Sequence, residues 1–117
     1  MTSLLILYLA GGGLLVLLSL PLYFEKIPPN GLYGFRVEAT LKDPKLWYAV
    51  NRFSAKRQSA AGLALAATAL VLFNVPYISE DTYALGCLLV FAVVFIIGLV
   101  QSFRYMRQAA TPQEKHD

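Results

Sequence analysis

Residues 82–103 read Thr-Tyr-Ala-Leu-Gly-Cys-Leu-Leu-Val-Phe-Ala-Val-Val-Phe-Ile-Ile-Gly-Leu-Val-Gln-Ser-Phe, a run of 22 residues without a charge. At a rise of roughly 1.5 Å per residue, an α-helix of that length is about 30 Å long, the thickness of a bilayer's hydrocarbon core. Two other uncharged blocks of similar length, 4–24 and 58–79, lie earlier in the chain. Three such blocks in 117 residues leave little other chain to bury them. The sequence therefore predicts an all-α integral membrane protein.

The composition agrees with three transmembrane spans in a single domain, 1–117. Hydrophobic residues make up 57% of the chain and the mean hydropathy is +0.56, which is too apolar for an ordinary soluble fold of this size. We place the spans at about 4–24, 59–78 and 83–104, with a loop at 25–58 and a tail at 105–117. The first block follows only three uncharged residues and is longer than the apolar part of a usual signal peptide. We expect it to be a retained span.

Lysine and arginine are unevenly distributed along the chain. Seven of the ten lie in the loop 25–58 and the other three follow the last uncharged block, which ends at Phe103, whereas the connection between the second and third spans carries Glu80 and Asp81. The positive-inside rule places the long loop and the C-terminus in the cytoplasm and the N-terminus outside. The net charge of +3 then belongs to the basic face of a plasma (inner) membrane protein. With no base-reading motif beside it, we expect no nucleic-acid partner.

The residues that catalysis or transport would require are missing from the spans. No Asp, Glu, Lys, Arg or His lies within the uncharged blocks 4–24, 58–79 and 82–103, which argues against a transporter or pump working alone. Cys87 is the one cysteine and His116 in the tail is the one histidine. These residues offer neither a catalytic set nor a group of metal ligands. We expect no enzyme activity, no cofactor and no bound metal.

Small residues in the first two spans predict close helix contacts. The first span carries Gly11-Gly12-Gly13 at its centre. The second has small residues at four-residue spacing, with Gly62 and Ala66 as one pair and Ala60 and Ala64 as another. Such faces let helix backbones approach each other, either within this chain or against another subunit.

The second half of the loop predicts a short amphipathic helix. Asp43 is a helix N-cap residue and Pro44 suits the first helical position. At 100° per residue, Leu46, Ala49, Val50 and Phe53 share one face. Basic residues occupy one flank: Lys45, Arg52 and Lys56. We expect this helix to lie in the cytoplasmic membrane interface, with these three cations in contact with lipid head groups. It either ends there or runs on into the second span through Arg57 and Gln58 with a bend.

The first half of the loop concentrates polar and glycine residues that could form a binding site. The site that we predict has Arg36 at its centre, because its planar guanidinium can bind several oxygens at once. Neutral hydrogen-bonding residues could surround it, and Trp47 could cover it from lipid. The segment 29–40 would then fold back against the start of the 44–57 helix, with Arg36 near Asn51 or Trp47. The predicted set is Pro29, Asn30, Tyr33, Gly34, Arg36, Thr40, Trp47 and Asn51.

Each of these residues also has a simpler interpretation. Trp47 could be an interfacial anchor, and Tyr33 could belong to an aromatic belt. Arg36 could be only a charge that sets the topology. Asn30 and Gly34 could be only turn residues.

The loop resembles a known family motif. Residues 29–40 read Pro-Asn-Gly-Leu-Tyr-Gly-Phe-Arg-Val-Glu-Ala-Thr, and Trp47 and Asn51-Arg52-Phe53 follow. This run is similar to the pattern P-N-x-x-Y-G-[FY]-R-T-x-x-T, followed by W-x-x-x-N, of the SdpI-type immunity family. The run follows one predicted span and precedes two more, as in that family. Val37 stands where the family usually has Thr, and Ala55 where a Gly often occurs. Longer members carry a preceding membrane half that is not part of these 117 residues.

The resemblance implies a bacterial or archaeal inner-membrane protein that protects against a secreted, membrane-active toxin peptide. In some systems of the family this protection is coupled to holding a repressor at the membrane. The candidate partners are therefore the lipid bilayer, a toxin peptide, a cytoplasmic repressor and other membrane subunits. The alternative function is that of a non-catalytic accessory subunit of a larger membrane complex, docked through its small-residue faces.

The predicted orientation can be tested by cysteine labelling. In a chain without Cys87, we expect Glu80→Cys to react with an impermeant thiol reagent in intact cells. Lys42→Cys should react only after the cells are opened, because the basic loop stays inside. The opposite pattern would reverse the orientation.

Overall fold

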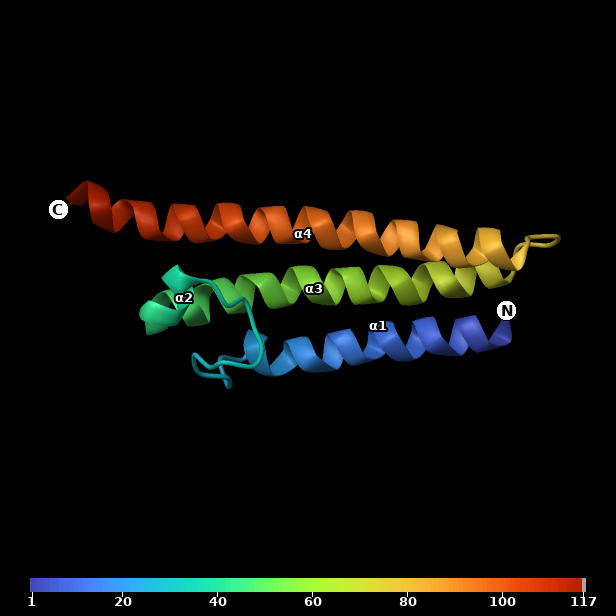
Figure 1. Ribbon diagram of the computed structural model, residues 1–117, viewed down its shortest axis with the longest axis horizontal. Helices are drawn as coiled ribbons and strands as arrows, with labels where there is room; N and C mark the ends of the chain where they lie inside the picture. The colour runs from blue at the N-terminus through green and yellow to red at the C-terminus, as the bar shows by residue number, and fades with distance from the viewer. Residues whose placement is uncertain (117) are drawn as a thin grey trace.

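The computed structural model describes residues 1–116, with side chains for residues 1–109. It contains four helices: α1 (Thr2–Tyr23), α2 (Glu38–Lys42), α3 (Pro44–Phe73) and α4 (Glu80–His116). No strand occurs in the described part, so the predicted all-α class is confirmed. The three long helices lie side by side with α3 packed against both α1 and α4 (Figure 1). Of the predicted tail, the side chains of Lys115 and His116, and all of Asp117, lie outside the described residues.

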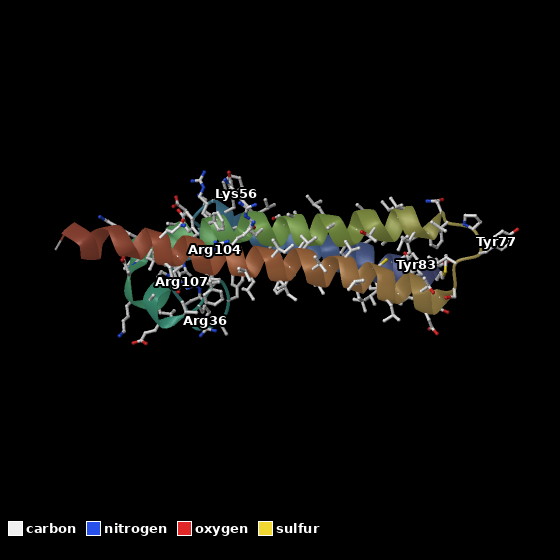
Figure 2. The ribbon with its side chains drawn as sticks, turned by 90° about the horizontal axis from the view of Figure 1, so that it is seen from above. Arg36, Lys56, Tyr77, Tyr83, Arg104 and Arg107 are labelled. Carbon is white, nitrogen blue, oxygen red and sulfur yellow. The ribbon has the colours of Figure 1, made fainter. Side chains whose placement is uncertain are left out.

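The two ends of the bundle differ in character. The N-terminus and the turn between α3 and α4 lie at one end, while the segment between α1 and α3 and the C-terminal part of α4 lie at the other (Figure 1). Figure 2 shows Arg36, Lys56, Arg104 and Arg107 toward this second end, far from Tyr77. We call it the loop end. Basic residues of the loop and of α4 therefore share one end.

Two helices have the length and composition of membrane spans, namely α1 and residues Glu80–Ala109 of α4. Only 17% of the most apolar stretch of each is buried inside the protein. Large apolar side chains point outward instead, with Leu17, Leu85 and Leu89 exposed by 63%, 67% and 66%. The core helix of a soluble protein would bury such residues, whereas lipid accepts them. The exposed apolar helices therefore indicate an integral membrane protein.

The helix α3 corrects two predictions. It runs without a break from Pro44 to Phe73, so the amphipathic segment continues into the second predicted span, as one of the two arrangements left open, and is not a short helix of its own. It also ends before the predicted limit at residue 78. No Gly or Pro interrupts it between Lys45 and Ala61, and Asp43 caps its start by accepting from the backbone N–H of Lys45 at 3.1 Å. The predicted amphipathic segment is thus the first part of a longer helix.

The apolar face of this first part contacts protein. Leu46 and Val50 are buried with Phe35 from the loop, and Phe103 from α4 packs against them. The prediction that this face lies on the membrane interface is therefore wrong. Lys56 and Arg57 leave an uncharged remainder, 58–73, only about 24 Å long. Because this uncharged part is short, α3 does not have the composition of a membrane span that α1 and α4 have.

Glycines set the distance between the long helices. Gly12 and Gly62 are buried against each other, and a Cβ at position 62 would lie 2.6 Å from the carbonyl oxygen of Gly12. A Cβ at Gly98 of α4 would lie 2.8 Å from Cβ of Arg57. Of the small-residue pairs, Gly62 and Ala66 face α1, whereas Ala60 is exposed. The predicted close contact is therefore made within the chain.

Two tyrosine hydroxyls join the helices at the opposite end. Tyr8 of α1 donates to the carbonyl of Ala84 in α4 at 3.2 Å, and Tyr83 donates to the carbonyl of Ala69 in α3 at 2.9 Å. Cys87 is fully buried in the same cluster, where it is a packing residue.

At the loop end, α1 finishes in a Schellman turn. The N–H of Lys26 donates to the carbonyl of Pro21 at 2.8 Å, and that of Glu25 to Leu22 at 3.3 Å. Glu25 has a φ of 59°, in the left-handed region that usually favours glycine. Pro21 lies in the last turn of α1, which ends at Tyr23.

The helix contact predicts opposite effects for neighbouring glycines. Gly12→Ala should lower the thermal stability of the detergent-solubilised protein, by about 1–3 kcal/mol, because its methyl group would overlap the carbonyl of Gly62. Gly13→Ala is the matched control, since no atom lies within 4 Å of its added Cβ. It should leave stability unchanged or raise it. Equal effects of the two substitutions would contradict the close contact.

Candidate functional site

The loop begins with a turn built on Asn30. Its side-chain oxygen accepts hydrogen bonds from the backbone N–H groups of Leu32 at 2.8 Å and Tyr33 at 2.9 Å. Its amide nitrogen donates to the carbonyl of Pro28 at 2.8 Å. An asparagine that bonds to the backbone two and three residues away is a common turn device. Asn30, next to Pro29, therefore shapes the chain that leads to the site.

Asn51 of α3 holds the middle of the loop. Its side chain is only 1% exposed, and its Oδ1 accepts from the backbone N–H of Phe35. Its Nδ2 donates to the carbonyl of Trp47, one turn earlier in α3, at 2.9 Å. Both ends of the amide are thus satisfied. Removing it would leave the buried N–H of Phe35 without a partner, which costs about 1–3 kcal/mol.

Trp47 provides the second attachment. Its ring is fully buried, and its Nε1 donates to the carbonyl of Ile27 at 2.7 Å. Since Trp47 and Asn51 are one helical turn apart, they present a single face of α3 to the loop. The loop therefore lies against the start of α3, as the fold-back prediction requires.

Gly34 lies directly on this face. Its φ is +114°, which side-chain-bearing residues rarely adopt. A Cβ there would lie 2.8 Å from Oδ1 of Asn51 and 3.0 Å from Cη2 of Trp47. Both the backbone conformation and the lack of space require glycine.

Thr40 closes the loop through α2. Its hydroxyl is fully buried and lies 2.8 Å from the carbonyl oxygen of Phe35 and 2.9 Å from that of Val37, which share its one proton. The same oxygen accepts from the N–H of Val37 at 3.1 Å. Val37, at the N-cap of α2, has no polar side chain to cap the helix. Thr40 therefore supplies the side-chain hydrogen bond that caps the start of this short helix.

Phe35 is the residue that the sequence reasoning failed to single out. Its N–H binds Asn51 and its carbonyl accepts from Thr40. Its ring packs edge-on against Phe103 of α4, with 4.8 Å between the centroids. Its signal in the sequence was its place between Gly34 and Arg36, in the middle of the motif. The carbonyl of Ile27, which accepts the hydrogen bond from Trp47, could not be predicted, because no side chain marks a backbone acceptor in the sequence.

Arg36 is not the centre of the cluster, and that prediction is wrong. Its side chain is exposed, and its Nε donates to the carbonyl of Asn30 at 2.9 Å. The buried centre is formed by Trp47 and Asn51 instead, because a neutral amide can be buried at far lower cost than a guanidinium. Tyr33 also lies outside the centre, with its hydroxyl donating to the carbonyl of Leu18 in α1 at 3.3 Å.

The predicted lipid-contacting cations lie on another face of α3. Lys45, Arg52 and Lys56 are all exposed. Two of these cations lie over the ring of Tyr23 at the end of α1. Cζ of Arg52 is 4.8 Å from the ring centroid, and Nζ of Lys56 is 5.5 Å from it. Tyr23 was not predicted as part of this group. Among the described residues, no three His, Cys, Asp or Glu side chains are close enough to hold a metal ion.

The fit of Gly34 predicts a large effect from one methyl group. Gly34→Ala should lower the thermal stability of the protein by about 2–4 kcal/mol, because it combines a strained φ with overlap on Asn51 and Trp47. Gly31→Ala, three residues earlier and with no atom within 4 Å of the added Cβ, should change stability by less than about 0.5 kcal/mol. If both variants are equally stable, the loop does not dock as described.

Comparison with known proteins identifies the family of this chain. The SdpI/YfhL protein family matches residues 26–102. The uncharacterized protein YfhL of Bacillus subtilis (strain 168) is 34% identical over 67 residues, which are 55% of this chain and 59% of that relative's length. No solved structure matches the chain. The family match includes the docked loop, all of α3 and the first part of α4, and so the chain belongs to the SdpI/YfhL protein family.

Proposed function

We propose that this chain is an SdpI-like membrane protein that confers resistance to a membrane-active toxin peptide or serves the associated membrane signalling. One observation carries the proposal. The residues that resemble the family motif fold as a single unit at the loop end, with Phe35 bound to Asn51 and Trp47 bound to Ile27. A mere connector between two spans needs no buried hydrogen-bonded core.

The proposal includes three crossings of the bilayer. The helix α3 packs between α1 and α4, so it accompanies two helices of span-like composition through the membrane. Its outward side carries exposed apolar residues such as Leu63 and Val71. Lys56 and Arg57 can extend their long side chains toward the head groups, which lengthens the effective span beyond residues 58–73.

In the proposed orientation the loop end faces the cytoplasm. The basic residues of the loop and of α4 lie at this end, as the positive-inside rule requires of a cytoplasmic face. The toxin peptide would then meet the outer surface or the spans, and a cytoplasmic partner such as a repressor would meet the loop.

Arg36 is the residue best suited to bind such a partner. The bond from its Nε to Asn30 fixes the side chain, and no other hydrogen bond to it is present in the described part of the chain. The terminal nitrogens of the guanidinium therefore remain for carboxylate or carbonyl oxygens of a partner.

The alternative function, an accessory subunit of a larger complex, relied on the small-residue faces. Gly12 and Gly62 contact each other within the chain, so this pair provides no docking surface for another subunit. The alternative keeps the exposed Ala60 of the second pair and the general exposure of apolar side chains, both of which lipid can cover equally well. We therefore prefer the immunity or signalling function.

A survival assay tests the proposal. The chain would be expressed in a Bacillus strain that lacks its own SdpI-type protein and is sensitive to the secreted peptide against which such proteins protect. Wild type should restore growth. Arg36→Ala should restore growth less well than wild type. Arg36→Lys should be equally impaired, because an ammonium cannot replace the planar guanidinium.

Lys42→Ala is the matched control for these variants. It removes one positive charge from the same loop, and its ion pair with Glu38 is exposed, with 72% and 80% of the two side chains accessible. Such a pair contributes little to stability. Failure of wild type to protect at normal expression would contradict the resistance function. A fixed-ratio complex with other membrane subunits would favour the alternative.

A further inference from the structure

Two adjoining cavities at the loop end, both of them grooves open at the surface, lie outside the docked loop. One, of about 350 Å³, is lined by Glu25, Arg52, Lys56 and Tyr105 among others. The second, of about 400 Å³, is mostly apolar and is bounded by Leu20, Ala60 and Leu63, again with Lys56. Both volumes are typical of small-molecule sites, about 300–1,000 Å³. Since Lys56 lines both, one molecule with a polar and an apolar part could occupy them together.

The charge of the polar cavity favours an anion. Arg52 and Lys56 outnumber the single carboxylate, Glu25. Within the described residues neither cation forms an ion pair with a carboxylate. Both instead lie over the ring of Tyr23, at 4.8 and 5.5 Å from its centroid, which holds them near the junction of the cavities.

The apolar cavity lies where a lipid chain would be. It is formed at the boundary of α1 and α3, just inside the point where α1 ends at Tyr23. Leu20 and Leu63 are 43% and 60% exposed, so the cavity borders the apolar outer surface of the spans. A tyrosine with two cations at the end of a span is typical of the head-group level of a bilayer.

We propose that an anionic phospholipid binds here, with its phosphate between Arg52 and Lys56 and an acyl chain along Leu20, Ala60 and Leu63. This site is separate from the function proposed above. At 100° per residue, Arg52 and Lys56 lie about 100–180° around α3 from Trp47 and Asn51. The lipid would join the end of α1 to α3 on the side that the loop leaves open.

Native mass spectrometry of the full-length protein in a non-ionic detergent can test the site. Phosphatidylglycerol should bind with a defined stoichiometry, and phosphatidylcholine much more weakly, because only the first is anionic. Glycerol phosphate, which carries the head-group chemistry without acyl chains, should not bind measurably. If it binds as tightly as the lipid, the anion comes from solution and the lipid site is contradicted.

Charge variants distinguish a built site from general attraction to a basic surface. Arg52→Gln and Lys56→Gln should each weaken phosphatidylglycerol binding about tenfold or more, because each removes a hydrogen bond to a charged group. Lys45→Gln is the control: it lies on the same flank of α3 but lines neither cavity, and should cost at most about fivefold. Glu25→Gln should strengthen binding, since it removes a repelling carboxylate.

Groove variants test the apolar half without changing the charge. Ala60→Phe should fill the cavity and weaken phosphatidylglycerol binding, whereas Ala67→Phe, at an exposed position of α3 outside both cavities, should not. Each variant should keep the thermal stability of wild type, which separates lost binding from lost folding. Equal losses for all three cation variants, or no effect of Ala60→Phe, would overturn the proposal.

Discussion

The hydrogen bond between the side-chain oxygen of Asn51 and the backbone N–H of Phe35 is the contact on which the loop end depends. It is buried, so its loss would leave a polar group without water to replace the partner. It fixes Phe35, whose carbonyl then meets Thr40 and whose ring meets Phe103 of α4. The side-chain amide of Asn51 thereby connects the long loop to α3 directly and to α4 through Phe35.

The bond also explains the residues around it. Only glycine fits at position 34, because the amide oxygen occupies the space of a Cβ. Trp47 fixes the start of the loop at Ile27, and the turn at Asn30 brings the chain across the face between these points. Arg36 is left outside this buried core, in a fixed position, with its charge in a polar environment. The motif therefore encodes a folded loop first and an exposed cation second.

Much of this architecture could be predicted from residue patterns. The uncharged blocks gave the long helices, and Asp43-Pro44 gave the start of α3. The family resemblance was found from the loop residues alone and is confirmed by the match over residues 26–102. Whether the amphipathic helix continues into the second span stayed open, because the charges at Lys56 and Arg57 suggested a boundary although no residue there breaks a helix. The centre of the cluster was misplaced, since charge drew attention to Arg36 whereas burial selects the neutral Asn51. Contacts through backbone carbonyls, such as that of Ile27, leave no trace in the side-chain sequence.

The central claim is that the loop is a folded element held by a buried amide. Amide hydrogen exchange at Phe35, measured by NMR on the wild-type protein in detergent micelles, tests it most directly. The account predicts exchange slowed by roughly a hundredfold or more relative to a free peptide, because the loop must open before water reaches this N–H. The N–H of Gly31 donates no hydrogen bond within the described residues, unlike those of Leu32 and Tyr33, which bind Asn30. It should therefore exchange faster than the N–H of Phe35. Exchange of Phe35 at the rate of an unstructured amide would contradict the account.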